Sequence, residues 1–171
     1  AKFTILQCCY WISVCLVYAF AEKFLTAYGL TKTQIGVTMA LANVASLLLQ
    51  PAIAALIDRN NVFSLRVCLS AGAGVASLIA LFELNPSNPA AVTAVLFGAM
   101  ATVTLTLQPL SNAVGFHYLN RGEKLDFTAG RGIASGAYAL ASLAYGFLFD
   151  AFGAPHVLWL YLAGNAGLFL M

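Results

Sequence analysis

Long apolar runs separated by short polar stretches dominate the chain. The charged side chains leave six long uncharged runs, at 3–21, 33–57, 67–82, 84–120, 132–149 and 151–171. About 20 apolar residues cross the hydrocarbon core of a bilayer, and lipid admits only helices or closed barrels. The runs lack the period-two alternation typical of strands. The pattern therefore predicts six membrane-spanning helices, at about 3–28, 33–57, 64–84, 90–118, 127–149 and 155–171.

Helix-breaking residues mark the predicted connections. After Gly29, the pair Thr31 and Gln34 has the spacing of a capping box, which opens a helix. The segment 85–89 reads Asn-Pro-Ser-Asn-Pro and is a clear loop signal. Short connections of this kind favour an all-α membrane bundle.

Composition supports this fold class and excludes others. The chain is 61% hydrophobic and 8% charged, whereas a soluble domain carries about 25% charged residues. A net charge of +2, spread along the chain, is too weak for a nucleic-acid surface. The four cysteines lie in apolar runs without disulfide or zinc spacing. We therefore expect no nucleic-acid partner, no metal and no cofactor.

Lysine and arginine are unequally divided between the two ends of the predicted helices. One end has six, against Lys23 and Lys32 at the other; the six are Lys2, Arg59, Arg66, Arg121, Lys124 and Arg131. The positive-inside rule places the richer end, and with it the N-terminus, in the cytoplasm. The first run has no signal-peptide cleavage site and is read as a membrane helix. We expect a plasma-membrane protein, in the inner membrane if the cell is bacterial.

Polar residues on several predicted helices share a face. A helix surrounded by lipid is apolar all round, so a polar stripe marks the face turned toward protein or water. At 100° per residue, the stripes on the first, fourth and fifth helices span arcs of only about 80–100°. The candidate solute-binding residues on these stripes and on a thinner one in the second helix are Trp11, Tyr18, Asn43, Gln50, Thr104, Gln108, Asn112, Arg131, Ser135, Tyr138 and Ser142.

The alternative for each of these residues is a hydrogen bond between helices, worth about 0.6 kcal/mol. The mixture of aromatic rings, amides and an arginine fork nevertheless suits a polar, ring-shaped solute. We expect a hydrophilic cavity lined by the first, second, fourth and fifth helices. The third helix has the small-residue run 70–74, which is suited to close packing.

The charged candidates have two readings each. Glu22 is the only acid on a polar stripe and is the candidate proton carrier, or it forms an interfacial pair with Lys23. Asp58 and Arg59 end the second helix and are either part of a gate or a solvated helix stop. Arg131 lies near a helix end, where its side chain could also extend to lipid headgroups.

Several short segments resemble the major facilitator superfamily, and within it the lactose permease-like branch of sugar and nucleoside proton symporters. The segments are 29–36, Leu49-Gln50-Pro51, Asp58-Arg59, 108–112 and 127–135. In the superfamily motif after the second helix, Asn61 stands for the second glycine. Asn112 stands where the lactose branch has a glutamate that pairs with the arginine of the fifth helix.

The resemblance implies that residues 1–171 are the N-terminal six-helix half of a twelve-helix carrier whose C-terminal half is not part of this sequence. Solute would bind near the midplane between halves that rock to expose it to each side in turn. The implied partners are a small polar solute, a proton, the lipid bilayer and the second half. Asp58 and Arg59 would help to hold a gate.

Two other classes are open from the sequence. Ser135-Gly136 and His156 suggest a six-span intramembrane serine protease. However, the two side chains would lie at opposite ends of their helices, some 20 Å apart, whereas a serine nucleophile needs its base within hydrogen-bond reach. We therefore do not expect an enzyme. A small channel or a self-associating half-carrier is the other alternative.

Overall fold

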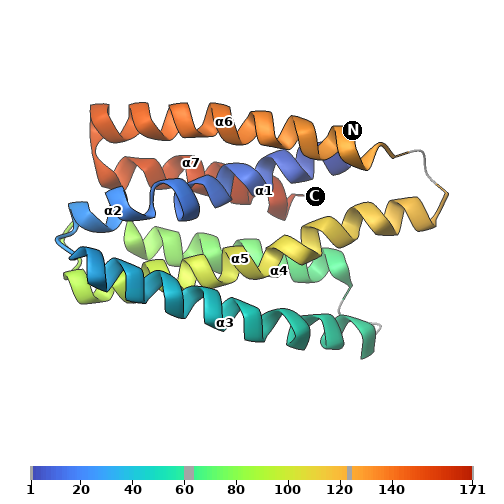
Figure 1. The fold of residues 1–171 in the computed structure, drawn as a ribbon, viewed down its shortest axis with the longest axis horizontal. Coiled ribbons are helices and arrows are strands. Elements are labelled where there is room, and N and C mark those ends of the chain that lie inside the picture. The colour runs from blue at the N-terminus through green and yellow to red at the C-terminus, as the bar shows by residue number, and fades with distance from the viewer. Residues whose placement is uncertain (1, 60–63, 123–124, 171) are drawn as a thin grey trace.

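The computed structural model describes residues 2–59, 64–122 and 125–170, and these residues form α-helices and no strand. The helices run lengthwise along the molecule and are joined by short connections (Figure 1). They are α1 (Lys2–Ala19), α2 (Ala21–Ala27), α3 (Lys32–Arg59), α4 (Leu65–Glu83), α5 (Ala90–Asn120), α6 (Phe127–Phe152) and α7 (Ala154–Phe169). The prediction of an all-helical chain is confirmed.

Among the described residues, five helices are long and apolar enough to cross a membrane, namely α1, α3, α4, α5 and α6. The helix α7 is equally apolar but has 16 residues. The count of six spans therefore stays a prediction.

The predicted helix 3–28 is interrupted at Phe20, which was not foreseen. Phe20 has φ −114° and ψ 2°, outside helical values, and its ring contacts Tyr145 on α6 at 5.6 Å between centroids. Hydrogen bonds still join Phe20 N–H to Leu16 and Phe24 N–H to Phe20. The two helices α1 and α2 thus form one kinked rod.

Side-chain caps fix several helix ends close to where the sequence predicts them. The capping box before α3 is confirmed, since Gln34 N–H donates to the Thr31 hydroxyl at 3.3 Å and Thr31 N–H donates to the Gln34 side chain at 2.8 Å. Ser64 caps α4 and Asp126 caps α6 by accepting from backbone N–H groups. Gly153, with φ 83°, makes the turn between α6 and α7, in a conformation that strongly favours glycine.

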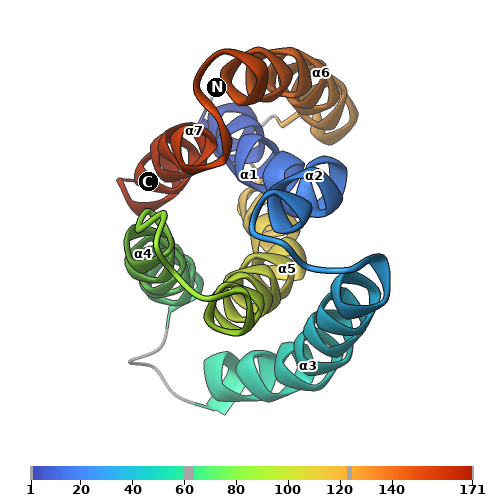
Figure 2. The same ribbon diagram turned by 90° about the vertical axis from the view of Figure 1, so that its left-hand side faces the viewer.

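Viewed end-on, the bundle has two unlike sides (Figure 2). α4 and α7 lie together on one side, where α4 packs against α5 and α7 packs against α1. On the other side, α3 packs on α5 and α6 packs on α1, so α3 and α6 form the two flanks. We call this second side, bounded by α1, α3, α5 and α6, the open side.

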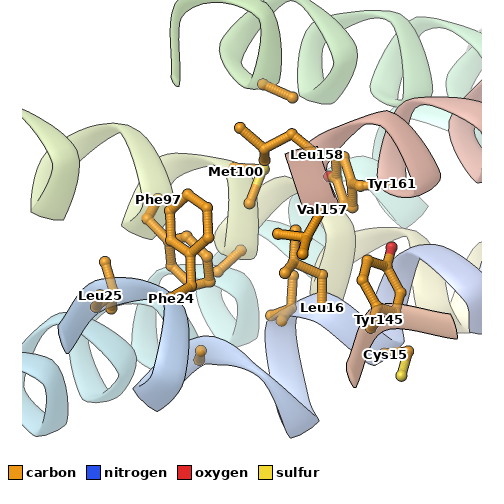
Figure 3. Close-up of a cluster of buried hydrophobic side chains, with 14 of the residues drawn as sticks. Cys15, Leu16, Phe24, Leu25, Phe97, Met100, Tyr145, Val157, Leu158 and Tyr161 are labelled. Atoms are coloured by element: carbon orange, nitrogen blue, oxygen red, sulfur yellow. The ribbon is translucent and has the colours of Figure 1, made fainter. Parts of the chain in front are cut away.

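The core lies where α1, α2, α5 and α7 meet (Figure 3). Leu16, Phe24, Phe97, Leu158 and Tyr161 are fully buried there. A second buried cluster around Tyr10, Leu69 and Leu107 fills the other half of the bundle. Close packing of α4 on α5 depends on the predicted small-residue run, because a Cβ on Gly72 would lie 2.5 Å from a Leu107 methyl carbon.

Candidate solute-binding site

The helix α6 presents three distinct faces. Its buried face contacts the bundle through Gly130, Ala134, Ala141 and Tyr145. Its most exposed face is apolar and consists of Ile133, Leu140, Leu143 and Phe147. The predicted polar stripe of Arg131, Ser135, Tyr138 and Ser142 lies beside the buried face and away from the apolar one. Tyr138 and Ser142 are therefore half-buried against the bundle, whereas Arg131 and Ser135 are exposed.

Contacts with α1 confirm the direction of this stripe. Tyr138 and Trp11 are both half-buried and pack edge to face, with ring centroids 5.9 Å apart and an interplanar angle of 84°. One turn further, the Ser142 hydroxyl lies 3.1 Å from the Cys15 thiol. The structure thus brings together residues of the first and fifth predicted helices.

Two amide side chains of α5 also belong to the candidate solute-binding residues. Asn112 is half-buried and accepts a hydrogen bond from the buried Gln7 amide of α1 at 3.3 Å. Gln108, one turn away, is also half-buried, and no side-chain hydrogen bond joins it to another described residue. Both α5 amides therefore keep hydrogen-bonding groups that the bundle itself does not use.

Arg131 has no carboxylate partner among the described residues. The ion pairs found there are Lys23 with Asp150 and Lys32 with Glu22. The Arg131 guanidinium is exposed and lies 6.0 Å from the centre of the Phe127 ring. The adjacent Ser135 is also exposed, and its hydroxyl donates to the Arg131 carbonyl at 3.2 Å.

A comparison with known protein families assigns the chain to a family. Residues 3–171 match the MFS_1 like family. The chain belongs to the MFS_1 like family. This match supports membership of the major facilitator superfamily, and with the apolar helices it makes the chain a multi-pass membrane protein of a transporter family. The comparison with curated proteins and the comparison with solved structures each gave no match.

Thr104 of this MFS_1 like protein makes its side-chain contacts with α7 and with its own helix. Its side chain is buried, and its hydroxyl lies 2.6 Å from the Tyr161 hydroxyl of α7 and donates to the Met100 carbonyl. Thr104 therefore faces α7, on the side away from Trp11 and Tyr138.

The two candidate residues of α3, Gln50 and Asn43, both donate hydrogen bonds within the protein. The Gln50 amide donates to the Ser46 hydroxyl at 3.1 Å and to the Leu105 carbonyl of α5 at 3.4 Å. Gln50 thus joins α3 to α5, as the packing alternative predicted. Asn43 is exposed, and its amide donates to the Met39 carbonyl one turn earlier on the same helix.

At the other end of α1 and α2, the charged residues pair differently from the predicted alternative. Lys23 contacts Asp150 of α6 at 2.6 Å rather than Glu22, because adjacent residues on a helix do not face each other. Glu22 lies 3.9 Å from Lys32, with both side chains exposed, and such a pair contributes about 0–1 kcal/mol. Tyr18, one turn before Glu22, is 53% exposed.

The predicted gate residues Asp58 and Arg59 are exposed at the end of α3. Asn61 of the same motif and Lys124 of the charge count lie outside the described residues. Ser135 and His156 are far apart, since Ser135 lies about 25 Å before the end of α6 and His156 lies in the first turn of α7. This separation disfavours a serine protease.

Two features were missed by the sequence reasoning. A cavity of about 600 Å³ lies between the ends of α1, α4, α5 and α7, and its lining includes Lys2, Arg66 and Arg121 but none of the predicted solute-binding residues. Glu83 at the end of α4 is fully buried. In the sequence, its helical spacing from Ala73, Ala76 and Ala80 indicates that it lies on the same face of the helix as these small residues.

Proposed function

We propose that this chain forms part of a carrier that moves a small polar solute, such as a sugar, oligosaccharide or nucleoside, together with protons. The observation that carries the proposal is the set of half-buried polar and aromatic side chains that α1, α5 and α6 contribute to one region. These are Trp11, Gln108, Asn112 and Tyr138.

The depth of these residues supports the proposal. Trp11, Tyr138 and Gln108 lie nine, eleven and twelve residues from the Lys2, Phe127 and Asn120 ends of their helices. At 1.5 Å per residue these positions are roughly 14 to 18 Å deep, close to the middle of a hydrocarbon core of about 30 Å. Polar groups at this depth that do not pair within the bundle are expected to serve a solute or an ion.

The chemistry of the set suits a polar ring. The faces and edges of Trp11 and Tyr138 stack on the apolar side of a sugar or base, and the Gln108 and Asn112 amides both donate and accept hydrogen bonds. Arg131 lies only about 6 Å from its helix end. We propose that it adds a fork of donors at the rim of the site.

We propose that transport follows alternating access, with the solute held between this six-helix half and a second half packed on the open side. Asp58 and Arg59 would contribute to a gate, and Glu22 of α2, on the polar stripe of the first predicted helix, is the acid for proton coupling. We propose a plasma membrane location, and the asymmetry of Lys and Arg supports an orientation with the N-terminus in the cytoplasm.

The test is uptake of a panel of sugars and nucleosides by proteoliposomes that contain the complete carrier, with and without a proton gradient. Trp11→Ala is expected to lower gradient-driven uptake at least about tenfold. Trp159→Ala is the matched control, because Trp159 is 59% exposed on α7, and it should leave uptake unchanged. Equal uptake by both variants would show that Trp11 is not part of the solute site. Uptake by wild type that does not depend on the gradient would show that transport is not coupled to protons.

A further inference from the structure

Glu83 is the one Asp, Glu, Lys, Arg or His among the described residues whose side chain is fully buried. It is the last residue of α4, and it continues a buried row whose other members are apolar. The row is Leu69, Ala73, Ala76, Ala80 and Glu83. Spacings of four and three residues keep these positions on one face of a helix. The acid therefore occupies a core position rather than the surface position usual at a helix end.

The carboxyl group of Glu83 has no hydrogen-bond partner in the described part of the chain, at either oxygen. The Thr93 hydroxyl, buried in the first turn of α5, is likewise unpartnered. The short connection between α4 and α5 brings the end of one helix to the start of the other. Two unsatisfied polar groups thus lie at the same end of this helical hairpin.

The ionisable groups of the neighbouring elements leave Glu83 without a counter-charge. Tyr28, between α2 and α3, donates its hydroxyl to the Glu83 backbone carbonyl at 3.5 Å rather than to the carboxyl. Lys23 of α2 pairs with Asp150, and Lys32 of α3 lies near Glu22. His156 of α7 is exposed against Phe152. The titratable side chains of α5, His117 and Tyr118, lie in its last turn at the other end.

A carboxylate in this position would be unstable. A buried charge without a partner costs several kcal/mol, and the partial negative charge of a helix C-terminus adds to that cost. The neutral carboxylic acid avoids both the cost of burying a charge and the repulsion from the helix C-terminus. Glu83 therefore fits the packed structure as a protonated acid, and it becomes an anion when water reaches it.

We propose that Glu83 is a proton-binding site that holds a proton while the ends of α2, α4 and α5 are packed together. When those ends separate, the acid O–H bond breaks, the proton passes to water and the electron pair stays on the carboxylate. The site deepens the proposed function, because it supplies a buried acid for the proton-coupled transport proposed above. It differs in kind from Glu22, which is already exposed to water.

Infrared spectroscopy of the complete carrier tests the proton site without reference to transport. The carbonyl stretch of a protonated carboxyl is expected at neutral pH in wild type and is expected to disappear in Glu83→Gln. The band should persist in Glu22→Gln and in Asp150→Asn, which remove exposed acids of α2 and α6. Absence of the band in wild type, or its survival in Glu83→Gln, would overturn the proposal.

Thermal unfolding in detergent gives a second measurement. The unfolded chain ionises Glu83 at neutral pH, whereas the folded chain keeps it neutral, so its contribution to stability is lost as the pH rises. The wild-type melting temperature should therefore fall toward higher pH more steeply than that of Glu83→Gln. Parallel curves for the two proteins would contradict a proton at Glu83.

Transport by Glu83→Gln, which mimics the protonated acid, tests whether the proton is coupled. Solute exchange, which needs no net proton movement, should stay within about twofold of wild type, while gradient-driven accumulation falls at least about tenfold. Retained accumulation would exclude Glu83 from coupling. If wild type itself shows no gradient-driven accumulation, the proposed function fails, and the infrared band still decides whether Glu83 holds a proton.

Discussion

At the scale of single residues, similar side chains on one helix have different roles. Thr104, Gln108 and Asn112 follow one another at four-residue spacing on α5 and so lie within an arc of about 80°. The hydroxyl of Thr104 is bonded to Tyr161, whereas the Gln108 amide has no partner among the described residues. The position of a residue within a stripe therefore gives its direction only approximately.

This difference predicts opposite effects of two substitutions. Thr104→Val removes one hydrogen bond of the buried Tyr161 hydroxyl and should lower stability by about 0.5–1.5 kcal/mol, with little change in KM for the solute. Gln108→Ala should leave stability nearly unchanged and raise KM. Thermal unfolding in detergent and uptake kinetics measure the two quantities. The same changes in stability and KM in both variants would contradict the proposed difference in role between Thr104 and Gln108.

Arg131 gives a second prediction at this scale. Arg131→Ala should lower uptake at least about tenfold at normal expression, because no other described residue offers a guanidinium at that point of the α6 stripe. Arg131→Lys keeps the charge without the fork and should be intermediate. Arg121→Ala is the control, since Arg121 lies at the end of α5 outside the stripes. Unchanged uptake by Arg131→Ala would remove it from the site.

At the scale of helices, the sequence was sufficient for most boundaries. Caps such as Thr31 with Gln34 are local, so three or four residues contain the information. The kink at Phe20 was not predictable, because no proline or glycine marks it and its ring contacts Tyr145, 125 positions along the chain. Local signals thus give helix ends, and contacts between distant helices give kinks.

Close helix packing gives a prediction for three glycines. A Cβ on Gly164 of α7 would lie 3.0 Å from the Cys9 backbone carbonyl, whereas one on Gly72 would meet the movable end of Leu107, and one on Gly136 would meet nothing. Gly164→Ala should therefore be the most destabilising, by about 1–3 kcal/mol. Gly72→Ala should cost less, and Gly136→Ala should be neutral or stabilising, by up to about 1 kcal/mol. Melting temperatures in detergent that reverse this order would show that α7 does not pack on α1 as described.

At the scale of the whole molecule, the helices are arranged differently on the two sides of the bundle. α4 and α7 lie together on one side, and α3 and α6 form the flanks of the open side (Figure 2). The candidate residues with unused hydrogen-bonding groups lie on α5 and α6. This arrangement supports a site that a second half completes.

Orientation is the prediction that belongs to the whole molecule. In a cysteine-free background, Ser87→Cys in the connection between α4 and α5 should react with a membrane-impermeant maleimide added outside intact cells. Asn120→Cys, at the opposite end of α5, should react only after lysis. The physical reason is the excess of Lys and Arg at the Asn120 end. Reversed labelling would place the N-terminus outside.

The sequence by itself determined that this chain is a helical membrane protein, where most of its helices begin and end, and which of them have polar stripes. These properties depend on hydrophobicity and on the 3.6-residue period, which act over neighbouring residues. The tertiary structure alone decided that Gln50 bonds to α5 and Thr104 to α7, that Trp11 contacts Tyr138, and that the buried Glu83 carboxyl has no hydrogen-bond partner among the described residues. Each of these outcomes depends on which distant helix lies opposite, and no local pattern contains that information.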